Sequence, residues 1–219
     1  MPNTNRSSRR IRAPRASTRS LISGALLTLG LGAALAACGG PQTGSEGQPM
    51  TIAGRWTSDC VVASPQQVFK LAFEMDAVTW KLDYQAFGDA SCTSKFLTVH
   101  IEGPYQLTSP STVVADAWNA RFGFTSKQVT PHSDAAAGFL ASAAGCGRAG
   151  FTAGVATDIL EAGCAGLGSY PKASCPAELD LAWREGDTLR LGARPADGNL
   201  CSEARRPAEL SQVALHRQP

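Results

Sequence analysis

Apolar residues recur at every second position along several stretches of the chain. Two of these runs, residues 69–75 and 78–84, are separated only by Asp76 and Ala77. In a strand, alternating side chains point to opposite faces, so each run would present one apolar face. The two runs and the short gap between them predict a tight β-hairpin.

The same alternation predicts further strands separated by turn residues. They lie at 97–101 before Gly103-Pro104, at 112–124, at 179–183 and 189–191 around a turn at 185–187, and at 213–215. A first strand at 52–56 brings the expected number to about eight, joined by short connections. This pattern predicts a mainly β protein with an antiparallel barrel or sandwich.

Residues 133–169 interrupt this pattern with a block rich in alanine and glycine, which we call the excursion. Asp134 is a suitable cap for a short helix running to about Ala144, and residues 157–162 suit another helical turn. We expect the excursion to lie between barrel strands, over one barrel mouth.

The N-terminus has the pattern of an export signal. Residues 1–20 hold six arginines and no acidic residue, and an apolar stretch of 15 residues follows at 21–35. A basic stretch followed by a short apolar core is typical of a secretory signal, and this core is shorter than the roughly 20 residues of a membrane-spanning helix.

The sequence Leu35-Ala36-Ala37-Cys38 resembles the lipobox of bacterial lipoproteins. The resemblance implies a signal peptide at 1–37, cleavage before Cys38, and a diacylglyceryl group and acyl chains such as palmitate on that cysteine. Residues 38–50 would then be a lipidated flexible tether, and 51–219 a single domain. The expected location is the bacterial cell envelope, anchored in a membrane; Gly39 indicates the outer membrane.

Charge and cysteine content fit an exported domain. Losing residues 1–37 removes six of 20 basic residues and none of 18 acidic ones, so the formal net charge changes from +2 to −4. A negative net charge gives no electrostatic reason to expect nucleic-acid binding. Seven cysteines are present. Lipidation of Cys38 leaves six, which predict three disulfides in an oxidising compartment.

Chain position suggests how the six cysteines pair. Cys60 follows the first strand and Cys92 precedes a later one, so they can meet at one barrel end. We also expect the pair within the excursion and the pair that flanks the last hairpin, which are Cys146–Cys164 and Cys175–Cys201. No two cysteines have CxxC spacing and the three histidines lie apart, so we expect no metal site and no cofactor.

The chain holds no sequence signature of catalysis. There is no G-x-S-x-G elbow, no H-E-x-x-H motif and no phosphate-binding loop. We therefore do not expect an enzyme.

Gly54-Arg55-Trp56 opens the first predicted strand. Gly-x-Trp at this place resembles the opening motif of lipocalins and related calycin barrels. The resemblance implies that Trp56 closes one barrel end beneath an arginine from the last strand, a cation–π pair worth roughly 0.5–2 kcal/mol. The candidate partners are Arg205, Arg206 and Arg217.

A wider pattern surrounds this motif. Gly54 to Cys60 is followed by the alternating strand at 68–73, aromatic residues at Trp80 and Tyr84, Cys92, and a strand ending in glycine. A closing segment runs over 189–192 and 201–210. Over roughly residues 52–213 these features resemble the adenomatosis-polyposis-coli-down-regulated protein family.

The resemblance implies an antiparallel lipocalin-like (calycin) barrel or half-barrel of about eight strands with an apolar cavity. Animal members of the family are membrane-tethered antagonists of Wnt signalling, thought to take up the lipid that Wnt carries. A bacterium has no Wnt pathway. What carries over is the capacity to hold an acyl chain or a similar apolar ligand.

The expected function is therefore a membrane-anchored extracytoplasmic protein that binds a lipid or another apolar ligand. The inward-facing residues expected to line the cavity are Phe69, Leu71, Phe73, Trp80, Leu82, Tyr84, Trp118 and Phe122. The alternative is a core closed by its own side chains. The domain would then be a protein-interaction module, such as an envelope assembly factor or a protease inhibitor, whose protein partner the sequence does not name.

Overall fold

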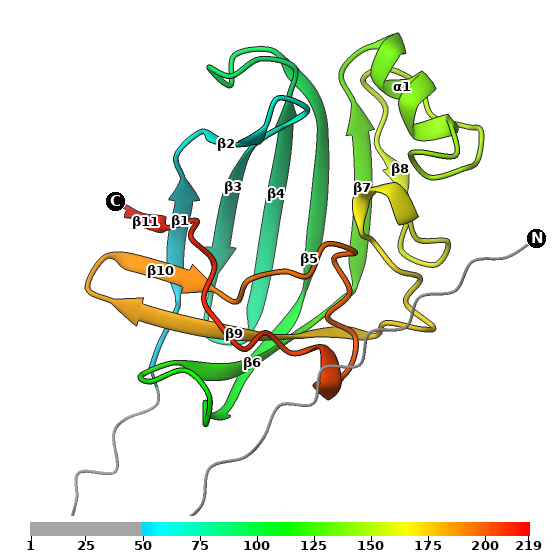
Figure 1. Ribbon diagram of the computed structural model, residues 1–219. Helices are drawn as coiled ribbons and strands as arrows, with labels where there is room; N and C mark the ends of the chain where they lie inside the picture. The colour runs from blue at the N-terminus through cyan, green and yellow to red at the C-terminus, as the bar shows by residue number, and fades with distance from the viewer. Residues whose placement is uncertain (1–49) are drawn as a thin grey trace, which may run out of the picture. The chain divides into compact units, whose positions relative to one another are not determined.

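The computed structural model describes residues 50–219 (Figure 1). The predicted signal peptide, Cys38 and most of the predicted tether lie outside these residues. The described elements form one 11-stranded antiparallel sheet with a single α-helix and two short 3-10 helices. In chain order they are β1 (Gly54–Ser58), β2 (Val61–Ser64), β3 (Gln67–Met75), β4 (Thr79–Phe87), β5 (Lys95–Pro110), β6 (Trp118–Gly123), β7 (Ser126–Pro131), α1 (Asp134–Ala141), β8 (Thr157–Asp158), η1 (Ala165–Leu167), β9 (Ala177–Glu185), β10 (Thr188–Leu191), η2 (Glu203–Arg205) and β11 (Leu215–Gln218).

Eight of the strands close into a ring in the order β1, β3, β4, β5, β6, β9, β10 and β11, with β11 pairing back onto β1. The first strand completes the closure because it has a partner on each edge. Trp56 of β1 pairs with Phe73 of β3 on one side and with Arg217 of β11 on the other. The predicted mainly β, eight-stranded antiparallel barrel is confirmed.

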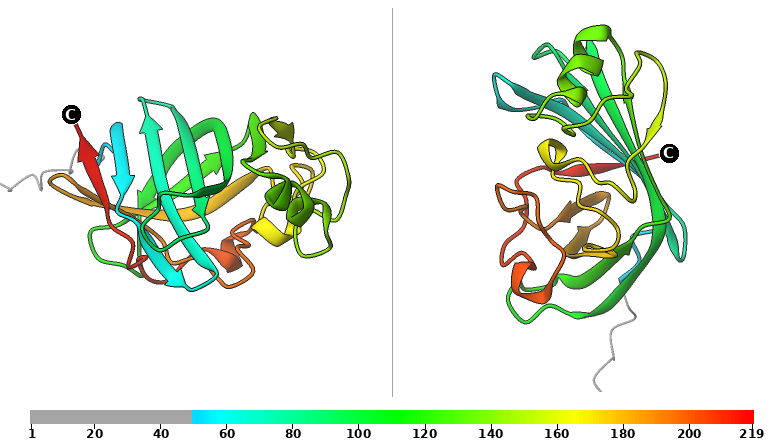
Figure 2. Two further views of the ribbon diagram at one scale, coloured as in Figure 1. Left: turned by 90° about the horizontal axis from the view of Figure 1, so that it is seen from above. Right: turned by 90° about the vertical axis from the view of Figure 1, so that its right-hand side faces the viewer.

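The sheet extends beyond the ring at one end, which we call the flared end. It does so because β5 changes partner along its length: residues 105–110 pair with β6 inside the ring, and residues 97–102 pair with β7. On the opposite side β2 pairs with the first residues of β3. The edges of the flared sheet are therefore β2 and β8 (Figures 1 and 2).

Gly103 lies where the partner changes. The strand predicted to end at Gly103-Pro104 instead continues as β5 to Pro110. A Cβ on Gly103 would lie 2.0 Å from the carbonyl oxygen of Gly123, so only glycine lets β5 pass beneath the junction of β6 and β7. The strand predicted at 112–124 is shorter than expected: residues 112–117 are not in a strand, β6 covers only Trp118–Gly123, and the unpredicted strand β7 begins at Ser126.

The excursion folds over the inner face of β5 and β7 (Figure 2). Leu140 of α1 and Ile159 pack against Val99 and Val129 in one buried cluster. The helix is shorter than predicted. Its N-cap is Ser133 rather than the expected Asp134, because the Ser133 hydroxyl accepts the Ala136 N–H at 3.2 Å. Residues 157–158 form the short strand β8 instead of a helical turn.

All three predicted disulfides are confirmed. Cys60–Cys92 joins the end of β1 to the loop between β4 and β5, at the flared end. Cys146–Cys164 lies within the excursion, and Cys175–Cys201 ties the segment before β9 to the segment after β10. Each bond thus fastens an irregular segment to its surroundings, where the sheet's own hydrogen bonds do not reach.

The interior of the ring is filled by large side chains. Trp56, Phe73, Trp80, Phe122 and Phe124 belong to one buried cluster. The Trp80 ring lies 5.0 Å from the Phe122 ring in an edge-on arrangement, and its Nε1 donates to the Gly123 carbonyl at 3.0 Å. Aromatic rings at such distances attract one another beyond the gain from burial alone. The ring therefore has a solid aromatic core.

Candidate ligand-binding site

The register of β3 and β4 places the predicted apolar residues of both strands on one face. Phe73 pairs with Leu82, and Leu71 pairs with Tyr84, one row closer to the flared end. Trp80 pairs with Met75 on the same face. Because Trp56 also pairs with Phe73, this face is the inside of the barrel.

Burial divides the predicted residues into two groups. Phe73, Trp80 and Phe122 are 5%, 3% and 2% exposed, so they belong to the aromatic core of the ring. The other group, Phe69, Leu71, Leu82 and Tyr84, is partly exposed and faces the interior of the flared end. Together with Ile101 of β5, which pairs with Leu82 and was not predicted to line the cavity, we call this group the inner wall.

Trp118 belongs to neither group. It begins β6 and pairs with Pro110 at the far end of β5, whereas Ile101 of the inner wall lies near the middle of that strand. Alternation along β6 puts Trp118 on the same face as Ala120 and Phe122. The side chain is partly exposed at the end of the barrel remote from the inner wall.

The inner wall is mostly aromatic and aliphatic, with one polar end. The rings of Phe69 and Tyr84 stack with centroids 5.4 Å apart. Burial raises the pKa of the Tyr84 phenol, so its hydroxyl keeps its proton over the physiological range. The neighbouring inner face of β5 and β7 is covered by the excursion, while the half formed by β3 and β4 keeps this partly exposed apolar surface.

The opposite end of the barrel is closed around Trp56, which is fully buried. Its indole Nε1 donates to the carbonyl of Ile52 at 2.8 Å. Two guanidinium groups lie over the ring, that of Arg184 on β9 at 5.4 Å and that of Arg217 on β11 at 5.7 Å. The expected pair of Trp56 with an arginine of the last strand is thus made by Arg217.

Arg205 and Arg206, the other two candidates, do not reach Trp56. Both lie at η2, before the last strand, where Arg205 pairs with the carboxylate of Asp197. Arg206 donates to the carbonyls of Ala120 at 3.0 Å and Asp180 at 2.6 Å, so it fastens this segment to β6 and β9. They hold the segment after β10 in place rather than closing the barrel.

Lys127 on β7 is a charged residue of the interior that the sequence prediction missed. Only 2% of it is exposed, and its Nζ lies 3.5 Å from the centroid of the Phe124 ring. Burial lowers the pKa of Lys127 to about 8. The sequence pattern that could have revealed it is the alternation of Lys127, Val129 and Pro131. These three residues lie on one face of β7 and are all buried.

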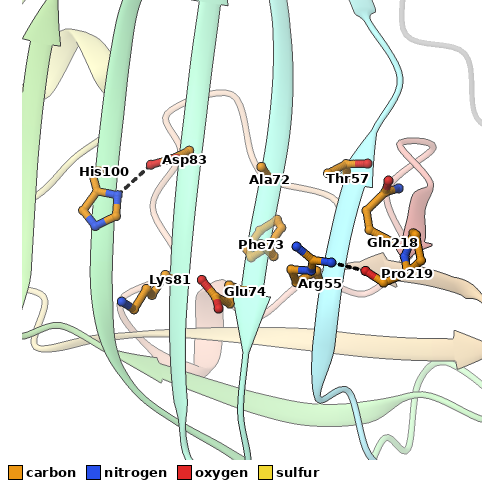
Figure 3. A pocket seen from close by; sticks show the side chains of 10 residues that line it. All are labelled: Arg55, Thr57, Ala72, Phe73, Glu74, Lys81, Asp83, His100, Gln218 and Pro219. Atoms are coloured by element: carbon orange, nitrogen blue, oxygen red, sulfur yellow. Dashed lines mark hydrogen bonds and ion pairs between the residues drawn. The ribbon is translucent and has the colours of Figure 1, made fainter.

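A separate shallow groove of about 420 Å³ lies on the outer face of the sheet, across β11, β1, β3 and β4 (Figure 3). Its lining mixes apolar residues with the charged residues Arg55, Glu74, Lys81 and Asp83. At one end His100 contacts Asp83 through Nδ1 at 2.6 Å, and its Nε2 contacts Glu102 at 3.0 Å.

Partial burial of His100 disfavours its charged form, but the hydrogen bonds to Asp83 and Glu102 outweigh this and raise its pKa. The outer groove is therefore suited to polar contacts, whereas the inner wall is suited to apolar ones. Within residues 50–219, no cluster of acidic, histidine or cysteine side chains could hold a metal ion. In the same part of the chain, no helix combines the length and apolar character needed to cross a membrane.

Comparison with known proteins gives one family. The model of the family described as adenomatosis polyposis coli down-regulated 1 matches residues 40–195. The match includes β1 through β10, and therefore the whole inner wall. The predicted closing segment from Cys201 onward lies outside the matched residues. A search of curated proteins found no match.

Proposed function

Since the chain belongs to the adenomatosis polyposis coli down-regulated 1 family, we propose that it is a binding protein that holds an apolar ligand, a lipid in the first place, against the inner wall of its flared barrel. The family is not known as a family of enzymes. The proposal therefore concerns binding alone.

The observation that carries the proposal is the partial exposure of the inner wall. Phe69, Leu71, Leu82 and Tyr84 face the interior of a barrel, yet they are less buried than the core residues Phe73 and Trp80 on the same strands. Covering apolar surface is worth roughly 25 cal/mol per Å², so an apolar ligand would gain by lying there. Ligand pockets typically combine such surface with a few polar groups that fix orientation, and the Tyr84 hydroxyl offers one.

We propose further that the protein works outside the cytoplasm, tethered to a membrane through lipid on Cys38. The lipobox-like sequence at 35–38 supports this. The three disulfides support it as well, since such bonds persist in oxidising compartments. A barrel within tether reach of a bilayer would exchange its ligand with that bilayer.

Replacing Phe69 by glutamate tests the binding proposal. Phe69 is partly exposed, so the charge can remain hydrated and the fold should persist, whereas a charge at Phe73 or Trp80 would disrupt the core. We expect Phe69→Glu to weaken uptake of a fluorescent fatty acid by the delipidated protein at least tenfold. Lys70→Glu is the matched control, because Lys70 is the next residue along β3 and faces outward.

Thermal melting of both variants would separate loss of binding from loss of folding. Equal uptake by folded Phe69→Glu and Lys70→Glu would contradict the inner wall as the site. If the folded wild-type protein takes up no apolar probe, the binding proposal fails. The charged outer groove of Figure 3 would then favour the protein-interaction module.

A further inference from the structure

We propose that the ligand is an amphiphile with a carboxylate head group, and that Lys127 binds this head group while the apolar chain lies along the inner wall. The inference rests on the proposed function and names the chemical class of its ligand.

Lys127 lies at the edge of the inner wall. Lys127 on β7 pairs with Ile101 on β5, and Ile101 pairs with Leu82 on β4. Directly paired residues in an antiparallel sheet point to the same face, so Lys127 shares the inner face with Ile101 and Leu82. The cation thus lies in line with the apolar surface, at the boundary between the flared end and the aromatic core.

Lys127 has few partners for a buried cation. An ammonium group has three hydrogen-bond donors, but the one acceptor from residues 50–219 is the carbonyl of Tyr170, at a long 3.4 Å. Its other contact is the face of the Phe124 ring. No ion pair among those residues includes Lys127.

The burial of Lys127 without an ion-pair partner is unusual among the basic residues of the domain. Of the basic side chains in residues 50–219, Lys127 is the one that is buried, whereas Lys81 and Arg194 are exposed and paired with carboxylates. Burying a charge without an opposite charge is costly, and pairing it recovers much of that cost. A carboxylate that replaced the long contact with Tyr170 would supply the missing partner.

The neighbouring charges favour a head group with a single negative charge. Glu178 and Arg194 are the charged groups close enough to affect Lys127, and they act on its pKa in opposite directions. They also pair with each other, so neither forms an ion pair with the Lys127 ammonium. A carboxylate neutralises it, whereas a phosphate dianion would leave a second charge buried.

The experiment compares dodecanoate, dodecanol and dodecyl phosphate, which share one chain length and differ in the head group. With the wild-type protein we expect dodecanoate to bind about tenfold to a hundredfold tighter than dodecanol, as a charge-assisted hydrogen bond allows. Dodecyl phosphate should bind more weakly than dodecanoate. In Lys127→Met the preference for dodecanoate should disappear while the affinity for dodecanol stays within about threefold, because one unbranched chain replaces another.

Lys81→Met, which removes an exposed lysine from the outer face of β4, is the matched control and should leave both affinities unchanged.

A second readout, the pH dependence of binding, needs no variant. The affinity for dodecanoate should fall by about tenfold per pH unit above pH 8, as Lys127 loses its proton, while the affinity for dodecanol stays constant. The nearby carboxylates of Glu178 and Asp180 raise the pKa of Arg194, so Arg194 keeps its charge over this range.

Equal affinities of the wild-type protein for dodecanoate and dodecanol would overturn the role of Lys127 and leave the proposed function standing. So would a preference for dodecanoate that survives in Lys127→Met. Tighter binding of dodecyl phosphate would overturn the carboxylate assignment. If none of the three probes binds, the proposed function itself fails.

Discussion

Asp180 on β9 shows what a single buried charge contributes to this fold. The residue is 2% exposed, and no ion pair among residues 50–219 includes it. Burial raises the pKa of Asp180 to about 6, although the N–H groups of Leu181 at 2.7 Å and Gly192 at 2.9 Å donate to its Oδ1. The carboxyl group is thus easier to protonate in the folded protein than in the unfolded chain.

This predicts a definite pH dependence of stability. Because the folded pKa lies above the unfolded value, the stability from protonated Asp180 is fully present below pH 4 and is lost as the pH rises through about 6. Asp180→Asn keeps an oxygen to accept the Gly192 N–H and removes the charge. We expect the variant to raise the free energy of unfolding at pH 8 by up to about 3 kcal/mol, the equivalent of a shift of roughly two pKa units.

Urea unfolding of wild type and Asp180→Asn at pH 4, 6 and 8 measures this. The variant should gain most at pH 8 and least at pH 4. A uniform loss of stability at all three values would contradict the expected pH dependence, because the effect of the variant would then not come from the charge of Asp180.

At the scale of the element, the excursion decides which half of the inner face stays exposed. Cys164 belongs to the buried cluster that joins Leu140 and Ile159 to the inner face of β5 and β7. Its disulfide with Cys146 closes a loop with a sequence separation of 18 residues. Closing a loop of this size restricts the unfolded chain and stabilises the fold by about 3 kcal/mol.

Replacing both Cys146 and Cys164 by alanine should therefore loosen the excursion more than the ring. We expect faster hydrogen exchange of the backbone amides of α1, while the amides of β3 and β4 in the ring keep their protection. Mass spectrometry of peptides after exchange measures both regions in one experiment. Unchanged exchange in α1, or equal loss across the whole domain, would contradict this division.

The sequence predicts some elements well because their apolar pattern is complete. Alternation over 69–75 and 78–84 predicts the hairpin of β3 and β4, and its register makes both runs face inward. β7 went unpredicted because Lys127 and Pro131 occupy two of its three inward positions, so the apolar alternation is broken. The end of β5 was predicted wrongly because Gly103 signals a stop locally, and only the approach of Gly123 explains its place in a continuous strand.

The residues of the candidate site also divide into features that the sequence predicts and features that it does not. The shared inward face of Phe69, Leu71, Leu82 and Tyr84 follows from period-two alternation within two strands. Which inward residues stay exposed does not follow, because that depends on how the excursion folds back over β5 and β7. The arginine at Trp56 likewise depends on where β11 begins, and only Arg217 of the three candidates lies in that strand.

At the scale of the whole molecule, the proposed anchor makes its own prediction. Cys38→Ser removes the thiol that lipidation requires, so we expect the protein to leave the membrane fraction and to keep its signal peptide. Ser45→Ala, a change within the predicted tether, is the control and should alter neither property. Cell fractionation with intact-mass measurement reads out both. Normal processing and membrane retention of Cys38→Ser would contradict lipid anchoring.

If an apolar ligand lies on the inner wall, its position can be measured by magnetic resonance. The delipidated protein, with its methyl groups isotopically labelled, would be titrated with a fatty acid that carries a nitroxide spin label on its chain. We predict strong broadening of the methyl resonances of Leu71, Leu82 and Ile101, with saturation near one ligand per chain. Val113, an exposed residue between β5 and β6 at the end of the barrel remote from the inner wall, should be much less affected. Saturable broadening at Val113 alone, or none at any of these methyl groups, would contradict binding on the inner wall.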